Sequence, residues 1–215
     1  MSKSIYSLVL DDEVIAAIDR AAYTEGVSRS ALINRLLAAE VGYSTVQMRT
    51  RDIFQRVEEL LTGDMLFAMG DSSEASFRMR SALRYKYNPT VHYTVALGRQ
   101  GSSLGELRVA VRSRSDAFTL AVLQFFRLWE KLESAYIGAT DMSFEPNRLV
   151  RRLAPHTRDG GHIQETIDAD ALAAYIGAFD GAMKAFFENI GDPVAAAQAA
   201  EARMAEYVRA NGIIM

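Results

Sequence analysis

The first 43 residues combine one strand-sized apolar segment with two amphipathic segments of helical length. Hydrophobic and polar residues alternate in part over residues 6–10, which predicts a short strand before the acidic cluster at residues 11–13. Apolar residues then recur at helical spacing up to Gly26, a residue suited to a helix C-terminus. Ser28 is placed as the N-cap of a second helix, whose apolar stripe continues to Val41. The pattern therefore predicts a strand followed by two helices.

This N-terminal unit, residues 1–44, is too small to fold by itself. A lone strand leaves its backbone hydrogen-bonding groups unpaired, and a segment of about 43 residues buries too little surface to close a core. We therefore expect the strand to pair with the same strand of a second copy. The sequence predicts an obligate homodimer, or a higher oligomer built from dimers.

The unit resembles the ribbon-helix-helix DNA-binding proteins, the MetJ/Arc/CopG superfamily. The resemblance covers only the N-terminal part of the chain, and it rests on the alternation in residues 6–10, Asp12 and Glu13, Gly26, and residues 28–35. In that family the paired strands form an antiparallel ribbon in the DNA major groove. The second helix directs its N-terminus at a phosphate. The resemblance therefore implies double-stranded DNA as a partner.

The resemblance also implies which side chains would touch DNA. Outward positions of the ribbon would face the bases: Ile5, Ser7 and Val9. Positions near the ribbon and at the start of the second helix would contact phosphates: Lys3, Ser28 and Arg29. The outward face departs from the family, which places long polar or basic side chains there to read base edges. Residues 1–44 also carry six acidic and four basic side chains, a weak balance for neutralising phosphates.

The rest of the chain is predicted to hold a connecting helix, residues 45–64, and a larger domain, residues 65–215. Three segments of this domain alternate between apolar and polar residues: 77–87, 91–97 and 107–111. Three further segments have helical periodicity: 115–136, 169–190, and 193 to about 212. Residues 148–162 fit either a loop or another hairpin. The predicted fold class is α+β, with a ribbon-helix-helix dimerisation module followed by an antiparallel three-stranded meander packed against helices.

The polar face of this meander is strongly basic. Between residues 78 and 114, eight basic side chains face one acidic side chain, Glu106. Alternation assigns six of them to a candidate face for nucleic acid or another anion: Arg78, Arg80, Arg84, Lys86, Arg108 and Arg112. A solvated face, neutralised by an acidic helix of the same protein or of its dimer partner, explains the same pattern. Base stacking would require aromatic side chains among the cations, and His92 alone is placed there.

Composition and charge exclude several other functions. The formal net charge is −3 and the sequence pI is about 5.7, so the chain is not a uniformly basic nucleic-acid binder. Because the chain has no cysteine, it has no disulfide, thiolate nucleophile or cysteine metal site. His156 and His162 flank a glycine-containing segment, a spacing that would need metal ligands from elsewhere. No glycine-rich phosphate loop follows a strand, so we expect no enzyme, no catalytic residue, no cofactor and no metal.

The N-terminus reaches Asp11 too soon to contain the apolar core of a signal peptide, and the longest apolar run, residues 117–126, is too short to span a bilayer. We therefore expect a cytoplasmic protein with no membrane partner. The predicted function is a bacterial-type transcriptional regulator that binds an operator as a homodimer. Its C-terminal domain would sense a small-molecule effector of unidentified chemistry or extend oligomerisation. The alternative is a non-catalytic interaction protein, antitoxin-like or a mobilisation accessory, in which the N-terminal module mainly dimerises.

Overall fold

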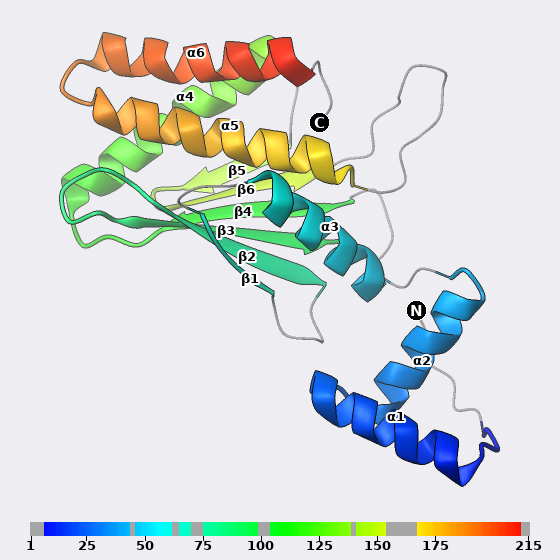
Figure 1. Ribbon diagram of the computed structural model, residues 1–215. Coiled ribbons are helices and arrows are strands. Elements are labelled where there is room, and N and C mark those ends of the chain that lie inside the picture. Colours follow the sequence, from blue (N-terminus) through cyan, green and yellow to red (C-terminus); the bar gives the residue numbers. More distant parts are fainter. Residues whose placement is uncertain are drawn as a thin grey trace.

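The computed structural model describes residues 7–43, 46–61, 65–69, 75–98, 104–138, 141–153 and 167–211 (Figure 1). Its helices are α1 (Asp12–Glu25), α2 (Arg29–Glu40), α3 (Val46–Leu60), α4 (Asp116–Tyr136), α5 (Ala169–Glu188) and α6 (Pro193–Asn211). Its strands are β1 (Leu66–Met69), β2 (Ser76–Ala82), β3 (Thr90–Leu97), β4 (Gly105–Val111), β5 (Met142–Glu145) and β6 (Arg148–Leu153). The predicted α+β class is confirmed.

The turn between α1 and α2 follows from two residues. Gly26 ends α1 in the left-handed region, at φ 66°, where a side chain would strain the backbone. Ser28 is extended, at φ −73° and ψ 150°, and its hydroxyl accepts a hydrogen bond from the Ala31 N–H at 3.2 Å. Asp12 and Glu13 lie in the first turn of α1, where carboxylates stabilise the positive end of the helix dipole.

The described strands form one antiparallel sheet in the order β1-β2-β3-β4-β6-β5. This sheet is wider than the predicted three-stranded meander, because β1 and the β5–β6 hairpin extend it at both edges. β1 and β5 have only four residues each, too few for a clear alternation. In β6 buried and more exposed positions alternate, but one of the buried positions holds a charged residue, Arg151, where an apolar residue is expected. These short or atypical strands are the ones that the pattern did not predict.

Strand β2 is shorter than its sequence pattern suggests. The alternation predicts a strand as far as residue 87, but β2 ends at Ala82 and the chain turns. The Leu83 N–H donates to the Pro89 carbonyl at 2.9 Å, and Tyr87 and Asn88 adopt positive φ angles of 65° and 43°. The prediction for residues 83–87 was wrong because a chain turned in this way cannot continue the β ladder. Arg84 and Lys86 therefore lie in an exposed turn and not on the strand.

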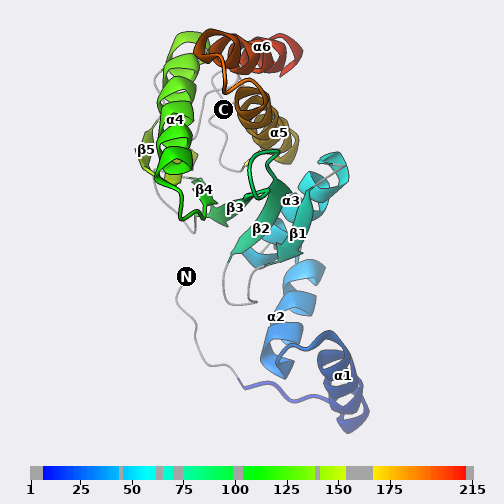
Figure 2. The same ribbon diagram turned by 90° about the vertical axis from the view of Figure 1, so that its left-hand side faces the viewer.

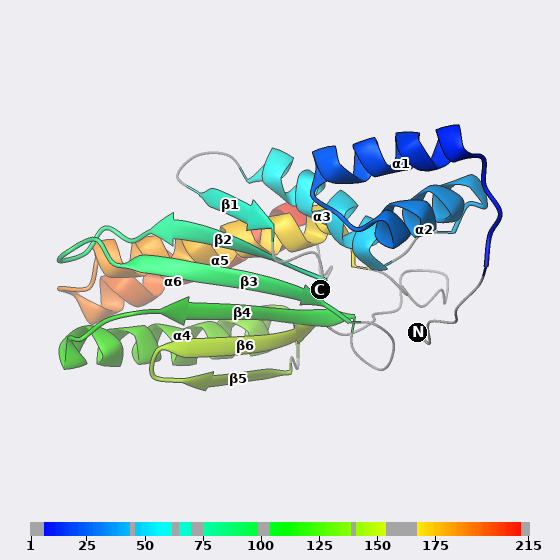
Figure 3. The same ribbon diagram turned by 90° about the horizontal axis from the view of Figure 1, so that it is seen from below.

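One face of the sheet is covered by helices and the other face is open (Figures 1 and 3). Helices α3, α4 and α5 lie on the covered face, and α6 packs over α4 and α5. The core contains a cluster of fully buried aromatic rings: Phe77, Phe125, Phe126, Trp129, Tyr175 and Phe179. Trp129 and Phe179 pack edge to face, with ring centroids 5.1 Å apart. This closed core makes the sheet and its helices a stable platform for whatever the open face contacts.

Helices α1 and α2 pack against each other and project away from this platform. Figures 1 and 2 both place them on the side of the sheet opposite α4, α5 and α6, which is the side of the open face. Helix α3 follows them in the chain and contributes Ile53 and Val57 to the main core. The N-terminal pair and the open sheet face therefore lie on one side of the protein.

Candidate nucleic-acid interface

Residues 7–10, the described part of the segment predicted to form the ribbon, are solvent-exposed in a single chain. Of the segment's predicted DNA contacts, Lys3 and Ile5 lie outside the described residues, whereas Ser7 and Val9 are both exposed. Leu8, predicted to face a core, is 59% exposed. Asp11 has extended dihedrals, φ −65° and ψ 142°, directly before α1. Within the described residues, the segment 7–11 pairs with no other strand of the chain.

Helices α1 and α2 bury little apolar surface between them. From Ser7 to Tyr43, three hydrophobic residues are buried: Ala22, Leu32 and Ala38. Larger apolar side chains of the same unit remain exposed: Leu8, Val9, Leu10, Val14, Tyr23, Leu36, Leu37, Val41 and Tyr43. A unit of this size with two alanines and one leucine inside has no adequate core of its own. Its exposed apolar residues are therefore candidates for burial against a partner.

The start of α2 carries the residues predicted to contact phosphate. The Ser28 side chain is engaged as the N-cap, so a phosphate here would meet the backbone amides of the first turn. Arg29 is paired with α1, because its Nε donates to Asp19 Oδ1 at 2.5 Å. This hydrogen bond and the charge of Asp19 raise the pKa of Arg29. The cation at this helix N-terminus is thus already neutralised in the single chain.

The open sheet face carries four of the six predicted basic residues. Arg78 and Arg80 on β2, Arg108 on β4 and Arg112 directly after β4 are all exposed, as alternation predicts. Arg84 and Lys86 belong to the turn described above. The sequence-based prediction omitted two further exposed arginines of the same face, Arg148 and Arg152 on β6. The sequence held only a partial signal for them: Leu149 and Leu153 share one parity, which would leave positions 148, 150 and 152 on the other side, but Arg151 interrupts the pattern.

Strand register fixes how these residues are arranged (Figure 3). Arg80 lies opposite His92 on β3, His92 lies opposite Ala110 on β4, and Ala110 lies opposite Arg148 on β6. In the neighbouring row, Arg78 and Arg108 flank Thr94. Four of the six arginines therefore lie in two adjacent rows, while Arg152 lies one row further along, opposite Glu106, and Arg112 follows the end of β4.

The arginines of this face differ in whether a carboxylate partner neutralises them. Arg108 is paired with Glu106, and Arg152 contacts Asp141 at 3.2 Å. Arg80, Arg112 and Arg148 form no ion pair with any carboxylate in the part of the chain that the structure describes. Partial burial, then the charges of Arg112 and Arg80, lower the pKa of His92 below its ordinary value of 6.5.

A second polar cluster lies inside the protein. Glu133 on α4 and Arg151 on β6 form a buried ion pair, with Arg151 Nε 3.1 Å from both carboxylate oxygens. The Tyr175 hydroxyl donates to the same carboxylate, and Trp129 Nε1 donates to it at 3.2 Å. The Arg151 guanidinium lies 4.6 Å from the centre of the Tyr175 ring. Because these side chains are shielded from solvent, the cluster holds α4, α5 and β6 together and offers no surface to a ligand.

A similar buried cluster lies below β2 and β3. Asp180 on α5 accepts hydrogen bonds from the Tyr93 hydroxyl at 2.8 Å and from the Ser81 hydroxyl at 3.0 Å. Lys184 Nζ lies 2.9 Å from Asp180. Burial, then the charge of Asp180, raises the pKa of Tyr93 well above its ordinary value. This tyrosine stays neutral and serves as a structural donor.

Two further observations concern the described residues only. They contain no group of three or more histidine, aspartate or glutamate side chains that could hold a metal ion. None of their helices combines the length and apolar character that crossing a bilayer requires.

No family model, curated protein or solved structure matches the chain. The features that bear on function are therefore the exposed N-terminal unit and the basic sheet face.

Proposed function

We propose that this chain is a DNA-binding transcriptional regulator that acts as a ribbon-helix-helix homodimer in the cytoplasm. The observation that carries the proposal is the N-terminal unit itself. Residues 7–11 lead into two helices joined through Gly26 and Ser28, and the unit buries three small or medium hydrophobic residues. Its sequence resembles the ribbon-helix-helix family over the same residues.

The dimer follows from the energetics of the exposed side chains. Leu8, Leu37 and Val41 are 59%, 53% and 75% exposed in the single chain. Fully burying an aliphatic side chain of this size contributes about 1.5–3 kcal/mol. Pairing residues 5–10 with the same residues of a second copy would satisfy the strand edge and cover such side chains together. A dimer thus resolves the missing core and the unpaired strand with one interface.

DNA binding follows from what the dimer would present. The paired strands would direct Ile5, Ser7 and Val9 away from the helices, toward the major groove. Ser7 supplies one hydrogen-bonding group, so sequence choice would depend on few direct contacts and on DNA shape. The backbone amides that follow Ser28 would receive a phosphate. Arg29 would join that contact when the phosphate competes with Asp19 for its guanidinium.

The C-terminal domain, on this proposal, senses a ligand or extends oligomerisation. Its core is closed by aromatic rings and by two buried polar clusters, and this core contains no residue of α1 or α2. A rigid domain fused to a DNA-binding dimer can transmit an effector signal by changing the separation of the two N-terminal units. The effector would be a small molecule.

The test combines sedimentation with duplex binding by the full chain. Wild-type protein should sediment as a dimer or a multiple of it, and Leu8→Asp should abolish the dimer because it places an unpaired charge in the interface. Ser7→Glu should keep the dimer and weaken binding to a preferred duplex, because the added carboxylate faces the DNA. A folded wild-type monomer, or equal duplex affinity for Ser7→Glu, contradicts the proposal.

Two observations favour a second function. The Arg29–Asp19 pair and the acidic balance of residues 1–44 both reduce phosphate affinity at the N-terminal unit. An interaction protein, antitoxin-like or a mobilisation accessory, would use this unit mainly to dimerise. Dimers of the wild-type chain that fail to bind any duplex at low salt would select this alternative.

A further inference from the structure

The basic face of the sheet has no role in the proposed ribbon. It consists of the outward side chains of β2, β3, β4 and β6, together with Arg112. The inward side chains of the same strands, such as Met79, Val109 and Leu149, are fully buried under the helices. The outward ones include six exposed arginines: Arg78, Arg80, Arg108, Arg112, Arg148 and Arg152. In a chain of net charge −3, this concentration of positive charge on one face calls for a polyanionic partner.

We propose that this open sheet face binds the phosphodiester backbone of duplex DNA, as a second contact surface beside the N-terminal dimer. The inference rests on the proposed DNA-binding function and adds a site to it. The sheet would add the phosphate neutralisation that the acidic N-terminal unit lacks. It would increase affinity for any sequence and leave base preference to the ribbon.

Geometry supports a contact that extends over several phosphates. Neighbouring strands lie about 4.8 Å apart, so Arg80 and Arg148, three strands apart, span about 14 Å. The row of Arg78 and Arg108 runs beside them, with Thr94 between as a further hydrogen-bond donor. Figures 1 and 2 place the N-terminal helices on the same side of the sheet as this face. One duplex could therefore reach both surfaces.

The side chains between the arginines favour a duplex over a single strand. Recognition of single-stranded nucleic acid usually needs aromatic rings on which bases stack. On the described outward positions of β2, β3, β4 and β6, the residues between the arginines are small or β-branched, apart from His92 and Glu106. Threonine hydroxyls and guanidinium groups suit phosphate oxygens instead. Partial burial is the main cause of the lowered pKa of His92, and the charges of Arg112 and Arg80 lower it further.

The experiment measures the salt dependence of duplex binding by the full chain. Each neutralised phosphate contributes about 0.9 to the slope of log affinity against log salt. Arg80→Gln with Arg112→Gln should flatten that slope by about 0.9 for each phosphate left without its arginine, and it should leave the ranking of duplex sequences unchanged. The matched control is Arg127→Gln with Arg209→Gln, which removes the same charge from exposed positions on α4 and α6. The control should keep the wild-type slope.

The outcomes separate this inference from the proposed function. An unchanged slope in the sheet variant, with wild-type binding intact, overturns the sheet contact and leaves the ribbon proposal standing. An equal loss of slope in the control also overturns it, because the effect then reports net charge. A flattened slope in the sheet variant, together with a Ser7→Glu variant that binds like wild type, supports the sheet contact and overturns the ribbon. Stronger binding to single-stranded DNA than to duplex overturns the choice of partner.

Discussion

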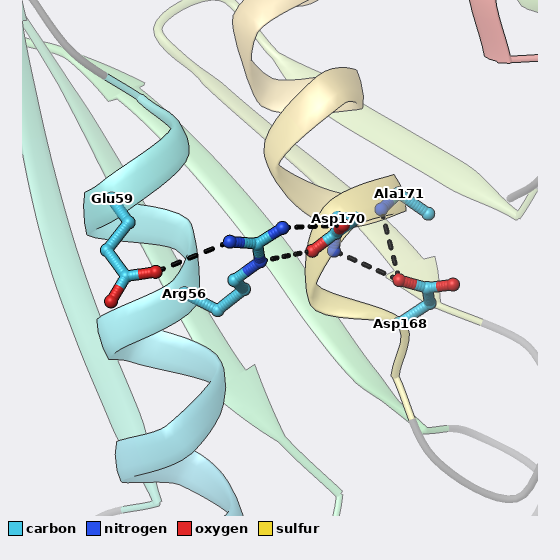
Figure 4. A network of polar contacts seen from close by, with 5 residues as sticks. All are labelled: Arg56, Glu59, Asp168, Asp170 and Ala171. Atoms are coloured by element: carbon cyan, nitrogen blue, oxygen red, sulfur yellow. Dashed lines mark hydrogen bonds and ion pairs between the residues drawn. The ribbon is translucent and has the colours of Figure 1, made fainter.

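Arg56 on α3 and Asp170 in the first turn of α5, which are 114 residues apart in the sequence, form a bidentate ion pair (Figure 4). Arg56 Nε and Nη2 lie 2.7 Å and 3.0 Å from the two carboxylate oxygens of Asp170. Asp168, the N-cap of α5, holds that turn by accepting from the amides of Asp170 and Ala171. The pair orients the helix that follows the N-terminal unit against the main domain.

Loss of this pair should lower thermal stability in a pH-dependent way. Its hydrogen bond from Arg56 lowers the pKa of Asp170 below the ordinary 3.8. A lowered carboxyl pKa in the folded state stabilises the fold above pH 3.8, and the stabilisation disappears as the pH falls through the folded-state value. Asp170→Asn should therefore lower Tm at pH 7. It should have no effect on Tm at a pH below the folded-state pKa of Asp170, where the carboxyl group is protonated. Calorimetry measures the difference.

Glu59→Gln is the matched control for Asp170→Asn. Glu59 also contacts Arg56, but at 3.4 Å and within the same helix. Such pairs stabilise weakly, so the control should change Tm less than Asp170→Asn at pH 7. Equal effects of the two substitutions would show that the contact between α3 and α5 contributes nothing specific.

Breaking the buried ion pair of Glu133 and Arg151 should destabilise the fold much more than breaking the exposed pair of Arg56 and Asp170. Removing one charge leaves the other buried without a partner, which costs about 3–5 kcal/mol. Glu133→Gln should reduce the free energy of unfolding by about that amount in urea denaturation. Glu133→Leu with Arg151→Met removes both charges and should be less destabilising than Glu133→Gln. A double variant that is worse than the single one would mean that the pair stabilises the fold beyond its mutual neutralisation.

Arg151 also explains where sequence reasoning failed. Residues 148–162 fit either a loop or another hairpin by sequence, because the three arginines within residues 148–153 obscure the alternation of β6. One of them faces inward, where burial alone would lower its pKa, and Tyr175 and Glu133 together raise it, so it remains charged. A buried cation depends on a partner 18 residues earlier in the chain, and no local pattern encodes that pairing. The long helices α4 and α5, by contrast, begin and end within two residues of the bounds that their apolar periodicity predicts.

The N-terminal unit illustrates the same division between local and non-local information. Gly26 and Ser28 determine the turn through their own conformational preferences, and the structure has α1 and α2 beginning and ending around them as predicted. The basic face was also predictable in part, because Arg78, Arg80, Arg108 and Arg112 follow a strict alternation. Arg84 and Lys86 were misplaced because the positive φ angles at Tyr87 and Asn88 redirect the chain after Ala82. The residue at which β2 ends depends on its pairing with β3, which stops at Ala82 and Thr90, and the sequence of β2 alone does not show this.

The exposed leucines of α2 provide a test of the dimer that leaves the ribbon untouched. In a monomer, replacing Leu36 and Leu37 with Gln would be a surface change, and such changes alter stability by at most about 0.5 kcal/mol. In a dimer that buries them, the same change should raise the dissociation constant and make Tm depend strongly on protein concentration. Sedimentation and thermal melts at several concentrations measure both. Leu120→Gln, at an exposed position of α4 outside the N-terminal unit, is the control for loss of an exposed apolar side chain.

The Arg29–Asp19 pair predicts a variant that binds DNA more tightly. Asp19→Asn removes the carboxylate that holds the Arg29 guanidinium, so the cation at the start of α2 becomes available to a phosphate. Duplex affinity should rise, and its salt slope should steepen by about 0.9 for each additional phosphate that is neutralised. Glu25→Gln releases Arg35 in the same way, from a pair of 2.7 Å, but in the middle of α2 and away from its N-terminus. That control should leave affinity nearly unchanged, and an equal increase in both variants would assign the effect to net charge alone.

His92 reports the charge on the sheet face directly. Partial burial lowers its pKa first, and the charges of Arg112 and Arg80 lower it further, so it should titrate below 6.5 in an NMR titration. Arg112→Gln removes one repulsive charge and should raise this pKa, whereas Arg127→Gln on α4 should not change it.

A duplex phosphate placed between Arg80 and Arg112 would favour the imidazolium and raise the pKa of His92. Binding to the sheet should therefore take up protons in the pH range where His92 titrates, so its affinity should increase as the pH falls through that range. A His92 pKa that does not respond to duplex DNA would place the phosphates elsewhere, even if the protein binds the duplex tightly through its N-terminal unit.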